Sequence, residues 1–178
     1  LYSPRERFVF PRVSNGTRFM DIQMNIALVG VGGFSRETMP ILFKRYEDNC
    51  EKVNFFYVDL VRIGDSIGGI KVIEESHFFE LPGEKYFNVG IADPRIRQNV
   101  VDRFLRNDCK ILSIFADNFV QHGENSIGEG CIFSYFSSVT SDVTIGRFFH
   151  CNIYSYVAHD SVIGDFVTFA PKVCCNGN

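Results

Sequence analysis

Residues 127–175 read IGEGCIFSYFSSVTSDVTIGRFFHCNIYSYVAHDSVIGDFVTFAPKVCC, and this stretch carries the strongest structural signal in the chain. Every sixth position from Ile127 to Cys175 holds isoleucine, valine, phenylalanine or cysteine. The dipeptide Ile-Gly also recurs every 18 residues, at Ile127, Ile145 and Ile163. Three six-residue segments in each repeat predict a parallel β-helix with three faces, in which each coil buries its apolar positions by stacking on the next.

The repeat predicts three interior columns of side chains. They are Ile127, Ile145 and Ile163; Phe133, Cys151 and Phe169; and Val139, Val157 and Cys175. In the second column a small residue stands between two rings, so we expect the Cys151 thiol to fill space rather than to react. The six cysteines contain no CxxC pair, and a bridge between the adjacent Cys174 and Cys175 would be strained, which favours reduced thiols.

Residues 24–117 have a different pattern, in which strands and helices alternate. An apolar run at residues 25–30 leads into a glycine-rich turn and then a helix, for which Ser35 is a suitable N-cap. Further strands are expected at residues 53–58, 86–91 and 111–115, and Pro94 begins a helix whose apolar stripe includes Ile96, Val100, Val101, Phe104 and Leu105. This alternation favours an α/β Rossmann-like domain at 24–117, followed by the β-helix at 118–178.

Composition narrows the class of partner. The chain has 46% hydrophobic residues and a formal net charge of -3, which disfavours nucleic acid as a partner. It contains no apolar run long enough for membrane insertion and no secretory signal, so we expect a cytoplasmic protein. Residues 1–23 carry two prolines and four arginines without helical or strand periodicity, and are interpreted as a leader or flexible arm, possibly not native.

The turn after the first strand is a candidate anion site. Gly30, Gly32 and Gly33, followed by Phe34, stand between a strand and a helix, where backbone amides can approach a phosphate. The turn is not a complete GxGxxG motif, which favours a mononucleotide or a nucleotide sugar over a dinucleotide. Asp59 follows the second strand, at a position suited to a ribose or base contact. A turn that only packs and a solvated Asp59 are the alternatives.

His159 is the candidate for proton transfer. The residues one repeat away on either side are Ser141 and Gly177, so the repeat itself does not require a histidine at this position. Asp160 follows it directly, and a carboxylate beside an imidazole can fix the tautomer that acts as a general base. An ordinary surface histidine is the alternative. The sequence has no metal-ligand spacing such as HxxxH, so we predict no metal site.

Residues 145–152 and 157–167, together with Ala170-Pro171 and Asn176-Gly177-Asn178, closely resemble a known family. They are similar to the left-handed β-helix sugar acetyltransferases of the sialic acid O-acetyltransferase and bacillosamine or perosamine N-acetyltransferase type. The resemblance extends back through the glycine-rich turn and covers the chain from Met24 to its end. The left-handed sense of the β-helix is implied by this resemblance alone.

The resemblance implies direct transfer of acetyl from acetyl-CoA to a sugar amine or hydroxyl. It assigns His159 as the general base and Asp160 as its supporting acid. It places Asn152 near the acceptor sugar and the Gly177 amide at the acetyl carbonyl. It also implies a homotrimer, with sites between subunits and CoA along the edge of the solenoid.

The chain departs from this family at two positions and in its length. Members that act on 4-amino nucleotide sugars often carry histidine where Phe34 and Thr168 stand here, and relatives continue for further coils beyond Asn178. We therefore expect a β-helix that is incomplete at its C-terminus. The predicted function is N-acetylation of a nucleotide-linked sugar in surface glycan biosynthesis. O-acetylation of a sialic-acid-like sugar and a non-catalytic oligomerisation or sugar-nucleotide-binding module remain the alternatives.

Overall fold

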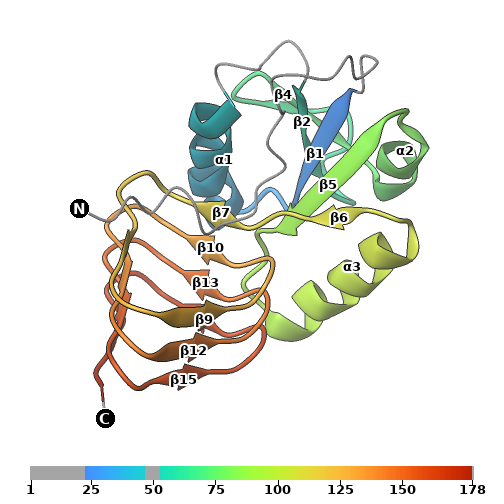
Figure 1. Ribbon diagram of the computed structural model, residues 1–178. Coiled ribbons are helices and arrows are strands. Elements are labelled where there is room, and N and C mark those ends of the chain that lie inside the picture. The colour runs from blue at the N-terminus through green and yellow to red at the C-terminus, as the bar shows by residue number, and fades with distance from the viewer. Residues whose placement is uncertain (1–22, 47–52, 178) are drawn as a thin grey trace, which may run out of the picture.

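The computed structural model describes residues 23–46 and 53–177. An α/β sheet is followed by a solenoid of stacked coils that extends away from it (Figure 1). The predicted leader at residues 1–23 lies outside the described residues, apart from Gln23. None of the helices in the described ranges is long and apolar enough to span a bilayer.

The first unit is a six-stranded sheet with the order β3-β4-β2-β1-β5-β6. Its strands are β1 (Met24–Val29), β2 (Val53–Val58), β3 (Ser66–Ile67), β4 (Ile70–Ile73), β5 (Glu84–Val89) and β6 (Lys110–Ile111). All neighbouring strands are parallel except β3 and β4, which are antiparallel. The parallel α/β sheet expected from the sequence is therefore present, and its assignment as Rossmann-like stays a prediction.

Helices cover both faces of this sheet (Figure 1). Helix α1 (Gly33–Tyr46) packs against Ile26 and Leu28, whereas α2 (Glu75–Glu80) and α3 (Pro94–Arg106) pack on the side of Ala27 and Val29. Because β1 lies between β2 and β5 and is covered on both faces, its side chains from residue 26 to 28 are completely buried. This burial explains the continuous apolar run in the sequence.

The start of α3 agrees with the sequence prediction, and the start of α1 does not. Pro94 is the first residue of α3, and the carboxylate of Asp93 accepts hydrogen bonds from the first-turn amides. The predicted N-cap at Ser35 is wrong, because α1 begins at Gly33 and Ser35 lies inside the helix. Its buried Oγ donates to the carbonyl of Gly90 at 3.3 Å, so this short side chain joins α1 to the residue that follows β5.

The solenoid is built from three parallel sheets. Its strands are β7 (Ile114–Phe115), β8 (Val120–Gln121), β9 (Asn125–Ile127), β10 (Ile132–Phe133), β11 (Ser138–Val139), β12 (Val143–Ile145), β13 (His150–Cys151), β14 (Tyr156–Val157), β15 (Val162–Ile163), β16 (Thr168–Phe169) and β17 (Cys174–Cys175). The sheet orders are β16-β13-β10-β7, β17-β14-β11-β8 and β15-β12-β9.

The pairing confirms the three predicted columns. Partners on neighbouring coils are 18 residues apart, as in Phe133, Cys151 and Phe169. Cys151 is completely buried, as expected for a packing residue. The ring of Phe149 lies edge-on to both Phe133 and Phe169, at 5.7 and 4.9 Å between centroids, and shares the space beside this column.

Solenoid pairing begins earlier than the six-residue pattern indicates. The expected strand at 111–115 is two strands: β6 belongs to the α/β sheet, and β7 belongs to the solenoid, where Phe115 pairs with Phe133. Pairing therefore starts at Ile114, ahead of residue 118, at which we predicted the second domain to begin. Gln121 pairs with Val139 and so occupies an interior position of the first coil. Because glutamine is polar, the six-residue apolar pattern does not extend back to this coil.

The α/β unit packs against one face of the solenoid, which we call the domain face (β7, β10, β13 and β16). The ring of Phe34 lies 4.8 Å from that of His150, and Arg97 donates to Thr168 at 3.0 Å. A coil has three faces, so the corner between the other two faces lies opposite the domain face. We call this corner, formed by residues 140–142, 158–161 and 176–177, the distal edge.

Candidate active site

His159 and Asp160 form a pair at the distal edge. The imidazole Nδ1 lies 2.7 Å from Oδ2 of Asp160, and both side chains are more than half exposed. Asp160 has a φ of 61°, which turns the backbone sharply between β14 and β15, and its amide donates to the carbonyl of Ser141 at 3.2 Å. The pair therefore stands at a solvent-facing corner that is fixed to the coil beneath it.

Gly177 lies beside this pair on the following coil. A Cβ at Gly177 would stand 2.7 Å from Cε1 and 2.8 Å from Nδ1 of His159. The two coils are held together by the amide of Ala158, which donates to the carbonyl of Cys175 at 2.8 Å. Glycine is therefore the residue that fits at position 177, and the expected stacking of Gly177 on His159 is present.

The His159 to Asp160 contact fixes which nitrogen of the ring can take a proton. An ionised carboxylate only accepts hydrogen bonds, so the contact holds the proton of a neutral imidazole on Nδ1. The lone pair then resides on Nε2. The arrangement matches a general base that is oriented by a carboxylate.

The glycine-rich turn occupies the carboxyl end of β1. Gly30 has a φ of +94° and donates to the carbonyl of Val58 at 2.8 Å, and a Cβ there would lie 2.9 Å from Cγ1 of Ile91. A Cβ at Gly32 or Gly33, in contrast, would meet no atom within 4 Å. There is therefore room for a ligand beside Gly32 and Gly33 at the start of α1, where the positive end of the helix favours an anion.

Two further predicted residues border this turn. The carboxylate of Asp59 accepts a hydrogen bond from the amide of Val61 at 2.8 Å. Phe34 packs on His150 of the domain face, so its ring joins the turn to the solenoid. His150 is completely buried, and burial lowers its pKa to about 3, so it is neutral at physiological pH.

The structure does not bring all predicted site residues together within one chain. His159, Asp160 and Gly177 share the distal edge. Asn152 lies on a different corner, between β13 and β14, where its Oδ1 accepts from the amide of Ile153 at 2.7 Å. The glycine-rich turn is on the side of the domain face. Within one chain the predicted site residues therefore fall into three separate groups.

Arg97, at the junction of the α/β unit and the solenoid, is a buried residue that was not predicted from the sequence. We expected Ile96 and Leu105 on the apolar stripe of α3, but they are 51% and 39% exposed, whereas Arg97 is completely buried with Val100 and Phe104. The spacing from Arg97 to Val100 and Phe104 is itself helical, and this signal could have placed Arg97 on the buried face.

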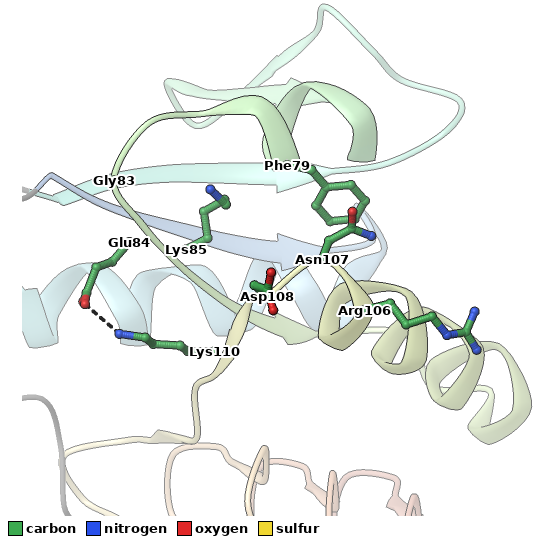
Figure 2. A pocket seen from close by; sticks show the side chains of 8 residues that line it. All are labelled: Phe79, Gly83, Glu84, Lys85, Arg106, Asn107, Asp108 and Lys110. Carbon is green, nitrogen blue, oxygen red and sulfur yellow. Dashed lines mark hydrogen bonds and ion pairs between the residues drawn. The ribbon is translucent and has the colours of Figure 1, made fainter.

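A separate hollow of about 530 Å³ is formed by residues of the α/β unit (Figure 2). It is lined by Phe79, Gly83, Glu84, Lys85, Arg106, Asn107, Asp108 and Lys110. Because it lies at the start of β5 and the end of α3, it is at the edge of the sheet opposite the glycine-rich turn. An ion pair of 2.6 Å between Glu84 and Lys110 borders it, and it holds none of the predicted site residues.

Within residues 23–46 and 53–177, no group of three histidine, cysteine, aspartate or glutamate side chains is placed to hold a metal ion. The chemistry that the described groups offer is proton transfer at the distal edge and anion binding at the glycine-rich turn. The first rests on the His159 to Asp160 contact, and the second on the free space beside Gly32 and Gly33 at the start of α1.

The chain is similar to proteins that acetylate sugars. It is 42% identical over 157 residues to the GDP-perosamine N-acetyltransferase of Escherichia coli O157:H7. The matched residues cover 86% of this chain and 71% of that protein. The structure of WeeI from Acinetobacter baumannii AYE matches with a TM-score of 0.83 at 37% identity, covering 88% of this chain and 74% of that one. No protein-family model matches the chain.

A more distant structure shares the fold. It is a mutant of perosamine N-acetyltransferase from Caulobacter crescentus in complex with CoA and GDP-perosamine. It matches with a TM-score of 0.73 at 18% identity, covering 86% of this chain and 71% of that one.

Proposed function

The chain belongs to the left-handed β-helix sugar acetyltransferases, and we propose that it transfers acetyl from acetyl-CoA to the amino group of a nucleotide-linked sugar. The observation that carries this proposal is the His159 to Asp160 pair with Gly177 packed against it, in a chain related to GDP-perosamine N-acetyltransferase. That relationship favours an amine as the acceptor over the hydroxyl of a sialic-acid-like sugar.

The proposed reaction is a direct attack. The acceptor nitrogen forms a bond to the carbonyl carbon of the thioester, and Nε2 of His159 takes the proton that this nitrogen loses. The bond from carbon to sulfur breaks, and CoA leaves as a thiolate that takes the proton from the imidazolium, which gives the thiol and restores neutral His159. Asp160 stabilises the imidazolium that forms, because its carboxylate lies 2.7 Å from Nδ1. The amide of Gly177 is proposed to donate a hydrogen bond to the developing oxyanion.

The glycine-rich turn is proposed to hold the nucleotide end of the acceptor. The free space beside Gly32 and Gly33 at a helix start suits a diphosphate, and the close packing of Gly30 on Ile91 holds the turn against the loop after β5. Asp59 is proposed to accept a hydrogen bond from the ribose or the base. By relationship to GDP-perosamine N-acetyltransferase, we propose a GDP-linked 4-amino sugar as the acceptor.

We propose that two copies of the chain complete each site in a homotrimer. Within one chain the glycine-rich turn lies on the side of the domain face, and His159 lies on the opposite edge. A neighbouring copy can bring its distal edge to the turn and to Asn152 of the first copy. CoA would then lie along the distal edge, beside Gly177. Three such sites follow from threefold symmetry.

We propose a cytoplasmic location and a place in surface glycan biosynthesis. Cys109, Cys131, Cys151, Cys174 and Cys175 are all free thiols, which is typical of a reducing compartment. The relationship to an enzyme that acts on GDP-perosamine supports an acceptor that is activated for assembly into a glycan.

The deciding experiment follows thiol release from acetyl-CoA with a panel of acceptors. The panel contains GDP-, UDP- and dTDP-linked 4-amino sugars, with free and CMP-linked sialic acids as the O-acetylation arm. We expect release with a GDP-linked 4-amino sugar, and a loss of about 100-fold or more in turnover for His159→Ala. Release only with sialic acids would overturn N-acetylation. If a folded trimer releases no thiol with any acceptor of the panel, the result would favour a non-catalytic module.

A further inference from the structure

Arg97 is completely buried where the α/β unit meets the solenoid. Its Nη1 donates to the carbonyls of Ile91 and Ala92, at 2.7 and 3.0 Å, and to the hydroxyl of Thr168 at 3.0 Å. Its Nη2 donates to the carbonyl of Phe166 and, at 3.4 Å, to that of Val167. One guanidinium thus joins the loop after β5 to the turn before β16.

These acceptors are all neutral, and among residues 23–46 and 53–177 no carboxylate forms a hydrogen bond or ion pair with the Arg97 guanidinium. Burial lowers the pKa of Arg97 to about 10, which leaves it a cation at neutral pH. Nδ1 of His150 lies 3.4 Å from Nη1, and burial together with the nearby Arg97 charge lowers the pKa of His150 to about 3. His150 is therefore a neutral neighbour that adds no repulsion.

Apolar packing alone would not require an arginine at this position. Desolvating a charge is costly, and a leucine or methionine can fill a buried helix position without that cost. Arginine supplies instead a rigid planar fork of donors, which can hold several carbonyl oxygens in one arrangement. Position 97 makes use of this fork, because its two terminal nitrogens reach two separate chain segments.

The two segments that Arg97 joins have different tasks in the proposed reaction. Ile91 packs under Gly30, so the loop after β5 supports the glycine-rich turn. The turn at residues 166–168 belongs to the solenoid, and the hydroxyl of Thr168 also donates to the carbonyl of Ala92 at 3.1 Å. Arg97 and Thr168 therefore hold the loop after β5 on the solenoid, and through Ile91 this loop holds the glycine-rich turn in position relative to the domain face.

We propose that Arg97 is a positioning residue for the acceptor. This inference rests on the proposed function, in which the turn of one copy holds the nucleotide and the distal edge of a neighbouring copy in the trimer carries the base. Because the nucleotide is bound by one unit and the amine reacts at another, a small shift between them displaces the amine from the thioester. A misplacement of about 1 Å can lower a rate by about 100-fold. Arg97 touches neither ligand and acts through the turn.

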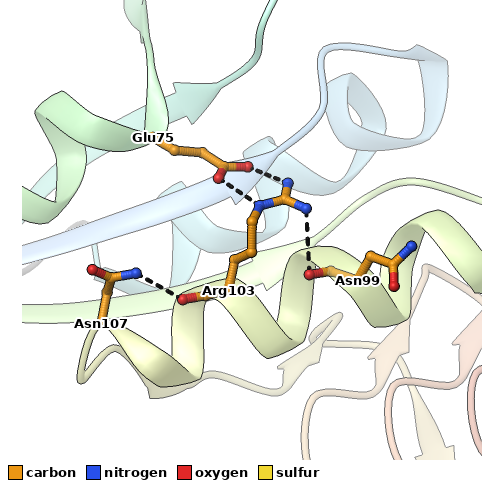
Figure 3. A network of polar contacts seen from close by, with 4 residues as sticks. All are labelled: Glu75, Asn99, Arg103 and Asn107. Carbon is orange, nitrogen blue, oxygen red and sulfur yellow. Dashed lines mark hydrogen bonds and ion pairs between the residues drawn. The ribbon is translucent and has the colours of Figure 1, made fainter.

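Arg103 offers a matched control on the same helix (Figure 3). Its guanidinium makes a bidentate pair with Glu75, with Nε and Nη2 at 2.8 and 2.6 Å from the carboxylate oxygens. This pair ties α3 to α2 within the α/β unit. Replacing Arg103 therefore removes a multidentate arginine contact without altering the contact between the turn and the solenoid.

The experiment compares Arg97→Lys, Arg97→Gln and Arg103→Gln in the full chain. For each variant, kcat and KM are measured for the nucleotide sugar at saturating acetyl-CoA, together with KM for acetyl-CoA and the melting temperature. We expect kcat/KM for the acceptor to fall by about 10-fold or more in both Arg97 variants, with Arg97→Gln the more affected. KM for acetyl-CoA should stay within about twofold. Arg103→Gln should lower the melting temperature with acceptor kinetics within about twofold of the unmodified chain.

Equal kinetic effects in the Arg97 and Arg103 variants at matched loss of stability would overturn the positioning role. If neither Arg97 variant folds, Thr168→Val removes one acceptor of the fork and should lower acceptor kcat/KM in the same direction. Unchanged kinetics in a folded Thr168→Val would then count against the proposal. An unmodified chain without His159-dependent transfer would instead refute the proposed function, a result that is separate from any effect of Arg97.

Discussion

The backbone of Gly177 packs directly on the imidazole of His159. The contact is so close that a Cβ at position 177 would stand 2.7 Å from Cε1 of the ring, well inside van der Waals distance. Two residues 18 positions apart in the chain thus share one small volume, because one coil of the solenoid separates them.

Gly177→Ala is expected to displace the imidazole of His159 and to lower kcat by about 10-fold or more, because the new methyl group overlaps the ring. Steady-state kinetics with acetyl-CoA and the nucleotide sugar would measure this. Gly164→Ala is the control, because a Cβ at Gly164 meets no atom within 4 Å. Equal turnover in the two variants would argue against a role for the contact.

Asp160→Asn is expected to lower turnover by about 10-fold or more, because an amide stabilises the imidazolium less than a carboxylate does. Asparagine tolerates the left-handed backbone at this position, where φ is 61°, so the fold should be kept. Asp142→Asn provides the control, since Asp142 occupies the same corner one coil earlier with a φ of 60°. A comparable loss of turnover in both variants would indicate an effect on the backbone turn of the coil instead of on the His159 to Asp160 contact.

Mixed oligomers test whether two copies share a site. His159→Ala and Gly33→Asp, which places a negative charge at the proposed phosphate position, should each be inactive alone. Random mixing in a trimer should restore about a quarter of the unmodified activity, because one site in four would pair an intact turn with an intact His159. Mass spectrometry would verify that mixed trimers form. Mixed trimers without activity would place the complete site in one chain.

The stability of the fold should depend on the protonation of His150. The folded pKa is about 3 and the ordinary value is 6.5, so between these values the unfolded chain binds a proton that the folded chain does not. Stability therefore rises with pH across this window and is lost as the pH falls through it. Urea unfolding at about pH 4 and pH 6 should show a steeper dependence in the unmodified chain than in His150→Gln, by up to about 1.4 kcal/mol per pH unit.

Thiol labelling should separate the interior cysteines from the surface. Cys131 and Cys151 are completely buried, and burial raises the pKa of each thiol to about 12, so iodoacetamide should not modify them in the folded protein at neutral pH. Cys174 is exposed and should react. Peptide mass spectrometry before and after denaturation would measure the difference, and rapid labelling of folded Cys151 would contradict its packing role.

The solenoid could be predicted from the sequence because its repeat is local and regular. A fixed step of six residues specifies which side chains point inward, and the same register carries Gly177 to His159. The first coil was not predicted, because the polar Gln121 stands at a position where the pattern requires an apolar residue. The α/β sheet was also recognisable, since buried parallel strands require continuous apolar runs such as the one in β1.

The junction between the two units could not be predicted in the same way. The burial of Arg97 depends on carbonyls from residues 91, 92, 166 and 167, which are brought together only by the tertiary fold. The buried Ser35 side chain inside α1 likewise bonds to the carbonyl of Gly90, just after β5, a tertiary contact that local capping preferences do not describe. Sequence patterns identified each unit and left their contacts undetermined.

The constant register of the coils has a consequence for how such a chain can evolve. Each coil uses 18 residues and advances the stack by one strand spacing, about 4.8 Å. Inserting or deleting a whole coil would therefore move the catalytic corner along the axis in a discrete step, while its direction around the axis stays the same. Gain or loss of a coil could therefore change the distance between the catalytic corner and the nucleotide-binding turn in fixed steps. Neither of these two parts would have to change its own residues.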